Sequence, residues 1–155
     1  MGTSSLPHRR RRAREIALQL IYELDLRPDL TADEAIEMYP WEAEPKDVTQ
    51  YAKALILGVY EHVDDIDALL RDHIVGWRTE RMVAVDRASI RLALFEGLIS
   101  RKVPIAVAIS EAVELTKMFG TVESGSFVNG ALGRIVRSSH GDSNETEYIA
   151  EATSD

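Results

Sequence analysis

The chain has 155 residues, a length that suits one domain, with 45% hydrophobic and 28% charged residues. No apolar run approaches the ~20 residues needed to cross a bilayer, and the absence of cysteine excludes disulfides, thiolate zinc sites and cysteine nucleophiles. The arginines near the start are followed by a segment that is interrupted by acidic residues and has no cleavage-like stretch. We therefore expect a soluble, cytoplasmic protein.

The charge is unevenly distributed along the chain. Net charge is −8, yet residues 1–14 contain five arginines and no acidic residue. The remainder has 13 of the 18 basic residues against all 26 acidic ones, a net charge of −13. An arginine cluster attracts phosphates, whereas an acidic body suits a basic protein, so this distribution predicts two different partners.

Residues 1–8 lack periodicity, and we expect a flexible N-terminal leader there. From residue 11 to about residue 26 apolar residues recur at helical spacing, and Pro28 ends the pattern. The opposite side of this helix carries Arg12, Glu15, Gln19 and Tyr22. The first helix is therefore predicted to be amphipathic, with a polar outer face.

Three shorter patterns follow. Thr31 and Glu34 form a capping box for a short helix, and Pro45 opens a longer one in which Gly58 indicates close helix packing. Asp64 is expected to cap a further helix that ends near Gly76.

Residues 82–99 form the stretch around which we expect the core to be built. Two apolar rows at spacings of three and four predict a central helix that is covered from more than one side. Asp86, Arg87 and Arg91 lie near its start, where charges must be paired or reach an open flank. Structural ion pairs are the more common outcome for such charges, and a binding role is the alternative.

Two helices are expected after the central one. Pro104 opens an amphipathic helix that Gly120 terminates, and a last helix follows from about residue 127 to residue 136. Gly130 inside the last helix is interpreted as a close backbone contact. Residues 138–155 are acidic and polar, and we expect a disordered tail. Without any strand-period segment, the chain is predicted to be all-α, with six or seven helices.

No residue constellation indicates an enzyme. Histidines lie near carboxylates at His62 and His73, but no Glu-x-x-His or His-Glu-x-x-His pair occurs to place metal ligands on one helix face. The serines near Asn129 are better explained as helix caps than as nucleophiles, and phosphate-binding glycine loops are absent. We therefore expect no catalytic residues, no metal and no cofactor.

The arginine cluster is the clearest binding signal in the sequence. Arg11 and Arg14 lie three apart on one side of the first helix, while Arg10 and Arg12 are expected to splay freely. Guanidinium groups bind phosphate oxygens and stack on unpaired bases. Because the rest of the chain is too acidic to span a duplex, short single-stranded RNA fits better than DNA. A basic leader or a membrane-attracted tail is the alternative reading.

Three segments together resemble the NusB family of bacterial transcription antitermination factors. They are RRRAREIALQLIY at residues 10–22, the stretch from VDRASIRLALFEGL to VPIAVAISEAVELTKMFG at residues 85–120, and SFVNGALGRI at residues 126–135. The resemblance covers roughly residues 9–137. It implies two packed helical bundles, binding of boxA RNA from ribosomal RNA leaders, pairing with the ribosomal protein NusE, and recruitment of RNA polymerase to an antitermination complex.

The resemblance also implies which residues bind each partner. The RNA role falls on Arg10, Arg11, Arg12, Arg14, Glu123 and Phe127, and the protein-partner role on Tyr22, Glu80 and Asp86. Some members of the family form a homodimer through the face that others use for NusE. Glu123, Gly125 and Ala106 depart from better-studied members, which affects the expected RNA affinity and base preference. The alternatives are a helical adaptor that binds no RNA, or a helper domain for an RNA methyltransferase.

Overall fold

The computed structural model describes residues 5–74 and 82–140, with side chains in the last helix described as far as residue 138. Within these ranges the chain forms seven α-helices, a short 3-10 turn at Trp41–Ala43 and no strand, which confirms the all-α prediction. The helices are α1 (Leu6–Leu26), α2 (Ala32–Met38), α3 (Lys46–Glu61), α4 (Val63–His73), α5 (Ala84–Ala93), α6 (Ile105–Phe119) and α7 (Ser124–His140), and the π-helical segment η3 (Leu94–Ile99) extends α5. No helix in the described ranges is both long and apolar enough to cross a membrane.

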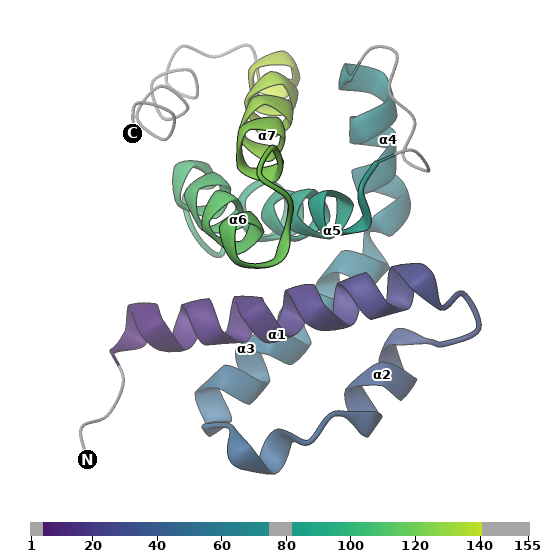
Figure 1. The fold of residues 1–155 in the computed structure, drawn as a ribbon, viewed down its shortest axis with the longest axis vertical. Coiled ribbons are helices and arrows are strands. Elements are labelled where there is room, and N and C mark those ends of the chain that lie inside the picture. Colours follow the sequence, from purple (N-terminus) through teal and green to yellow (C-terminus); the bar gives the residue numbers. More distant parts are fainter. Residues whose placement is uncertain (1–4, 75–81, 141–155) are drawn as a thin grey trace.

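The helices form two groups that pack across one another (Figure 1). One group consists of α1, α2 and α3, and the other of α4 to α7. Helix α1 lies between them, because it contacts α3 on one side and α5 on the other. This arrangement agrees with the two packed bundles that the family resemblance implies.

Helix α1 begins earlier than the sequence pattern predicts. Ser5 is the N-cap, its hydroxyl accepting a hydrogen bond from the backbone N–H of His8 at 3.4 Å, and Pro7 occupies the first turn, where it is tolerated. The predicted start at residue 11 is therefore wrong, and part of the expected flexible leader is helical. At the other end of the chain α7 continues to His140, past the predicted end at residue 136, and residues 141–155 of the expected tail lie outside the described residues.

Two of the predicted helix starts can be compared directly. The capping box of α2 is confirmed: the Thr31 hydroxyl accepts from the Glu34 N–H at 3.1 Å, and the Glu34 carboxylate accepts from the Thr31 N–H at 2.9 Å. Asp64 does not cap α4, because this helix begins at Val63 and Asp64 lies in its first turn. Gly76, near the predicted end of that helix, lies outside the described residues.

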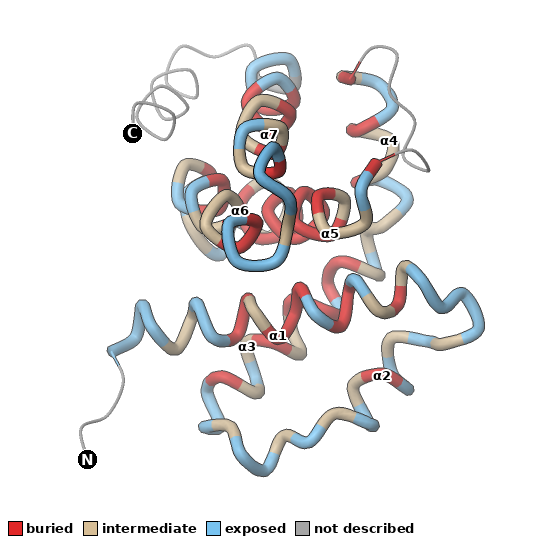
Figure 2. The backbone as a smooth tube through the Cα atoms, in the orientation of Figure 1, coloured by how far each residue is buried: buried red, intermediate tan, exposed pale blue. Residues whose placement is uncertain are grey.

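The core is built around α5 and η3, as the double apolar pattern predicts. Leu92 is 2% exposed and belongs to one row, whereas Ile90 and Leu94 are fully buried in the other. Figure 2 shows this buried stretch enclosed by its neighbours, and α5 contacts α1, α6 and α7. It is a central post covered from several directions.

Close packing explains one of the two glycines that the sequence singles out. A Cβ at Gly58 would lie 2.0 Å from Cζ of Phe95, so α3 approaches η3 more closely than any side chain would allow. This confirms the prediction for Gly58. The prediction for Gly130 is wrong, because a Cβ there would meet only the Arg134 side chain, at an ordinary contact distance of 3.6 Å.

We predict that Leu92→Ala lowers the free energy of unfolding by about 2 to 5 kcal/mol, the usual cost of truncating a buried leucine. Chemical denaturation measures this directly. Val122 is 98% exposed, so Val122→Ala is the matched control and should change the free energy of unfolding by about 0.5 kcal/mol or less. An unchanged denaturation midpoint for Leu92→Ala would show that α5 is not the centre of the core.

Candidate nucleic-acid interface

The five arginines of α1 meet side chains from distant elements. Four of them contact carboxylates: Arg9 contacts Asp47, Arg11 contacts Glu111 at 2.8 Å, Arg12 contacts Glu44 at 2.8 Å, and Arg14 contacts Glu96 at 2.8 Å. Arg10 instead lies over the ring of Tyr51, with 3.8 Å between its guanidinium carbon and the ring centroid. The prediction that Arg10 and Arg12 splay freely is therefore wrong, because both are held by partners that are remote in sequence.

Arg14 belongs to the buried interior. It is 4% exposed, its Nε donates to both oxygens of Glu96 at 2.8 and 3.0 Å, and its Nη1 lies 3.3 Å from Glu111. The hydroxyl of Tyr51 donates to the same Glu96 carboxylate, which is 1% exposed. Arg14, Glu96, Tyr51 and Glu111 together form the Glu96 network. It fixes α1 against η3 and α6, so the direct RNA contact that the resemblance implies for Arg14 remains a prediction that its burial disfavours.

A basic groove borders the Glu96 network, because Tyr51 lines one of its hollows and Arg14 and Glu111 line the other. Two adjoining hollows of 560 and 260 Å³ share Leu6, Arg10 and Lys102, and the larger one is also lined by Arg11. Arg11 and Lys102 are exposed. The hydrogen bond from Arg11 keeps the pKa of Glu111 below its ordinary value despite partial burial, so this carboxylate stays charged and holds Arg11 at the edge of the groove. The basic groove thus presents Arg10, Arg11 and Lys102 to solvent.

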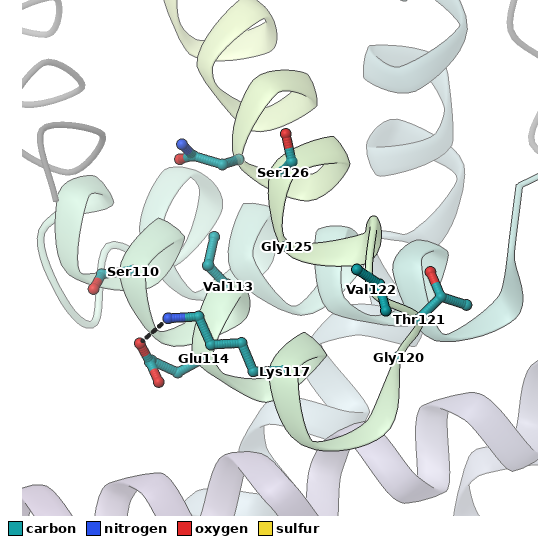
Figure 3. Close-up of a pocket in the computed structure, with 10 residues that line it drawn as sticks. Ser110, Val113, Glu114, Lys117, Gly120, Thr121, Val122, Gly125 and Ser126 are labelled. Atoms are coloured by element: carbon teal, nitrogen blue, oxygen red, sulfur yellow. Dashed lines mark hydrogen bonds and ion pairs between the residues drawn. The ribbon is translucent and has the colours of Figure 1, made fainter.

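Helix α6 connects the basic groove to a second, more polar hollow. This hollow of 570 Å³ lies between α6 and the start of α7, with Ser110, Glu114 and Lys117 on one wall and Ser126 and Asn129 on the other (Figure 3). Glu111 lines the basic groove, and residues three apart on a helix are neighbours, so the hollow beside Glu114 adjoins it.

The two remaining predicted RNA residues lie near the start of α7. Glu123 is exposed in the turn before this helix, whereas Phe127 is half-buried and packs against the core. Arg12 is exposed but occupied, since it also pairs with Glu15 at 3.3 Å. The structure therefore brings Arg10 and Arg11 together in one groove and places Glu123 and Phe127 separately, at the α6–α7 turn.

Tyr22 lies at the edge of a different hollow. This apolar hollow of 320 Å³ is lined by Glu15, Leu18, Gln19, Tyr22, Val85 and Phe119. Tyr22 is 37% exposed and Phe119 is 47% exposed, and both line this hollow, so they form an exposed apolar patch of the kind that marks interaction sites. Glu80, one of the predicted partner residues, lies outside the described residues.

The charges at the start of α5 are used within the fold. Asp25 accepts hydrogen bonds from Arg87 and, at 3.1 Å, from Arg91, which also contacts Asp67 at 2.8 Å. Asp86 is 5% exposed, and its Oδ1 has no hydrogen-bond partner among the described residues. The structural interpretation of Arg87 and Arg91 is therefore confirmed. The partner-binding role that the resemblance implies for Asp86 stays a prediction, which the burial of its side chain disfavours.

Sequence reasoning missed most of the partners that shape these surfaces. Glu96 and Glu111 are 82 and 97 residues from Arg14, so no local spacing connects them. Local spacing likewise indicates no role for Tyr51, Lys102 or Phe119 at these surfaces. One feature of the sequence does indicate these partners. Acidic residues outnumber basic ones outside residues 1–14, which implies that some of the acidic side chains contact the arginines.

These features define an all-α protein with a basic groove at one end of its first helix and an apolar hollow at the other end. The family model described as "NusB family" matches residues 11–137. The chain belongs to the NusB family. This is a family of transcription antitermination factors, which are not enzymes, as predicted.

Several relatives are similar over most of their length. The transcription antitermination protein NusB of Symbiobacterium thermophilum is 38% identical over 152 residues, covering 91% of this chain and 97% of that protein. The protein of the same name from Myxococcus xanthus is 42% identical over 132 residues, covering 81% of this chain and 93% of that protein.

Solved structures show the same fold. T. maritima NusB superposes with a TM-score of 0.78 at 33% identity, covering 95% of this chain and 99% of that one. A chain from a crystal structure of antitermination factors NusB and NusE in complex with double-stranded RNA superposes with a TM-score of 0.74 at 28% identity, covering 84% of this chain and 98% of that one.

We predict that Asp25→Asn lowers the free energy of unfolding by about 3 kcal/mol at neutral pH, because it removes one partner of a largely buried ion pair. Burial alone would raise the pKa of Asp25, but Arg87 and Arg91 lower it overall. The stabilisation is therefore complete above the unfolded pKa of about 4 and is lost as pH falls through the lower folded value. Urea denaturation at several pH values should show the difference between parent and variant narrowing below about pH 4.

Asp29→Asn is the control for this series. Asp29 pairs with Arg27 at 3.8 Å, and its side chain is 76% exposed, so its substitution should have little effect at any pH. A difference between the parent and Asp25→Asn that stays constant down to pH 2 would contradict the ion-pair account.

Proposed function

We propose that this protein is a transcription antitermination factor that binds single-stranded boxA-type leader RNA of ribosomal RNA operons and pairs with the ribosomal protein NusE. In this role it acts in the cytoplasm within an RNA polymerase antitermination complex and supports processive ribosomal RNA transcription. Membership of the NusB family supports the transcriptional role. The solved complex of NusB and NusE with double-stranded RNA supports NusE and RNA as classes of partner, whereas the choice of a single strand rests on the groove.

The basic groove is the observation that carries the RNA part of the proposal. Arg10, Arg11 and Lys102 line adjoining hollows on a chain whose net charge is −8. A concentrated positive groove on an acidic protein attracts a phosphate backbone locally, while the rest of the surface repels it. A single strand can follow such a short groove, whereas a duplex needs a wider basic face. Glu123 and Phe127 at the α6–α7 turn would extend the path along α6.

The apolar hollow around Tyr22 is the observation that supports the proposed binding of NusE. Tyr22 and Phe119 are partly exposed aromatic side chains, the type that most often supplies hot spots at protein interfaces. Glu15 at the rim adds a negative charge that suits a cationic partner. We also propose that Glu80 contributes to NusE binding, and the same role for Asp86 stays a prediction that its burial disfavours. A second copy of this chain is the competing occupant of the same hollow.

We predict that Arg11→Gln combined with Lys102→Gln weakens RNA binding and reduces its salt dependence. Each lost phosphate contact on a single strand should make the slope of log affinity against log salt shallower by about 0.7, and two contacts by about 1.4. Fluorescence anisotropy with labelled boxA RNA between low and physiological salt measures both quantities.

Arg27→Gln combined with Arg71→Gln is the matched control, because both arginines are exposed and neither lines the basic groove. Equal salt slopes for the parent and the groove variant would refute the site. Equal affinity of the parent for the corresponding RNA duplex would refute the single-strand preference and leave RNA binding in place. Failure of the parent to bind any RNA would favour a protein-interaction adaptor.

We predict that Tyr22→Ala weakens NusE binding by about 30-fold or more, the effect expected of an interface hot spot of about 2 kcal/mol. RNA binding by the free protein should not change, because Tyr22 lies outside the basic groove. Leu57→Ala is the control, since Leu57 has the same 37% exposure but lies on α3. Calorimetry measures NusE binding, and sedimentation of the parent and of Tyr22→Ala shows whether this hollow joins two copies of the chain instead.

A further inference from the structure

Arg10 differs from the other arginines of α1 in what it contacts. Its guanidinium carbon lies 3.8 Å from the centroid of the Tyr51 ring, a stacking distance, whereas the other four arginines contact carboxylates. The Nζ of Lys102 lies 5.7 Å from the same centroid. Two cations from elements far apart in sequence therefore gather at one aromatic ring on the wall of the basic groove.

The Tyr51 ring is fixed by a hydrogen bond at its hydroxyl. Its hydroxyl donates a hydrogen bond to the Glu96 carboxylate, which Arg14 fixes in turn. Burial raises the pKa of Tyr51 to about 12, and the hydrogen bond to Glu96 acts in the same direction, so the hydroxyl remains a donor at physiological pH. The ring therefore has little freedom to turn away, and Arg10 stacks on a fixed surface.

Lys102 is also fixed at its backbone by Glu96. The backbone N–H of Lys102 donates to the Glu96 carbonyl at 2.9 Å, and the preceding residue, Arg101, adopts a left-handed φ of 56° that turns the chain toward α6. Glu96 thus positions Tyr51 through its side chain and Lys102 through its main chain. The fold therefore sets the positions of the groove cations Arg10 and Lys102 before any ligand binds.

The pair of Arg10 and Tyr51 lines a hollow that is open to solvent, which a purely structural role for the pair would not require. The smaller hollow of 260 Å³ is open to solvent beside Arg10, Gln50, Tyr51 and Lys102. Its volume lies below the range typical of drug-sized ligands, and it suits a single flat group. Arg10 lies over the Tyr51 ring, and a guanidinium in this position can offer its other face to a nucleobase, which stacks on such planar groups.

We propose that the stacked pair of Arg10 and Tyr51 is a stacking site for one unpaired RNA base, and that Lys102 contacts an adjacent phosphate. The inference rests on the proposed RNA-binding function and extends it, because it assigns the pair to base stacking and not to charge neutralisation alone. Tyr51 is a positioning residue in this arrangement, since it orients the guanidinium that meets the base.

The test uses boxA RNA in which 2-aminopurine replaces one base at a time, because the fluorescence of this base is quenched when it stacks. The parent protein should quench the probe strongly at one position. Arg10→Lys keeps the charge and removes the stacking plane, so it should abolish the quenching and leave the salt slope unchanged. Because stacking of one base contributes about 1 to 3 kcal/mol, affinity should fall by about fivefold to more than a hundredfold.

An RNA that lacks one base distinguishes a loss of stacking from a loss of protein folding. Removal of the base at the quenched position should weaken binding to the parent but hardly affect binding to Arg10→Lys, since both changes remove the same contact. Tyr51→Phe keeps the ring and should retain the quenching, whereas Tyr51→Leu should lose it. Thermal unfolding of each variant shows whether the fold is intact.

The groove variant with Arg11→Gln and Lys102→Gln serves as the opposite control: it should bind more weakly and yet quench at the same position once saturated. Quenching that survives Arg10→Lys, or additive losses from Arg10→Lys and the abasic site, would overturn the stacking site while leaving RNA binding intact. Absence of RNA binding by the parent would instead refute the proposed function on which the site rests.

Discussion

The buried ion pair between Arg14 and Glu96 connects the binding surface to the core. Arg14 is 4% exposed and Glu96 is 1% exposed, so both charges are removed from water, and such a pair is tolerable only when its hydrogen bonds are satisfied. Glu96 accepts from Arg14 and from the Tyr51 hydroxyl, and Arg14 reaches Glu111 as well. Because Glu96 is a buried residue of η3, which continues α5, the orientation of α1 depends on the central helix.

The Glu96 network gives the arginines of α1 different physical roles. Arg14 contributes packing and orientation, and Arg12 is paired with Glu44 and Glu15. Arg9 is paired with Asp47 on the wall of the groove, and Arg10 and Arg11 line the groove as well. A carboxylate beside an exposed arginine lowers the net positive charge of the groove, but it also restricts the side chain and so reduces the entropy lost when a ligand binds. The excess of acids in the rest of the sequence thus contributes directly to the shape of the basic surface.

The sequence predicts local structure well and long-range pairing poorly, for identifiable reasons. The capping box at Thr31 and the close approach at Gly58 are confirmed because each follows from backbone chemistry at one position. Apolar periodicity alone predicts a start of α1 that is too late, although Ser5 and Pro7 form a recognisable helix start. The partners of Arg10 and Arg14, and the burial of Asp86, depend on how the helices pack, which helical periodicity does not encode.

The length of α1 also sets the separation between the two surfaces. Arg10 and Tyr22 are 12 residues apart on one continuous helix, and a rise of 1.5 Å per residue places them about 18 Å apart along its axis. The intervening turns are packed against both α3 and α5, so this spacing is rigid. Buried residues such as Ile16 and Leu20 follow the inner side of α1, while Arg11, Arg12, Gln19 and Tyr22 remain exposed. A single amphipathic helix therefore supports the core with one side and holds two chemically different surfaces at a fixed distance with the other.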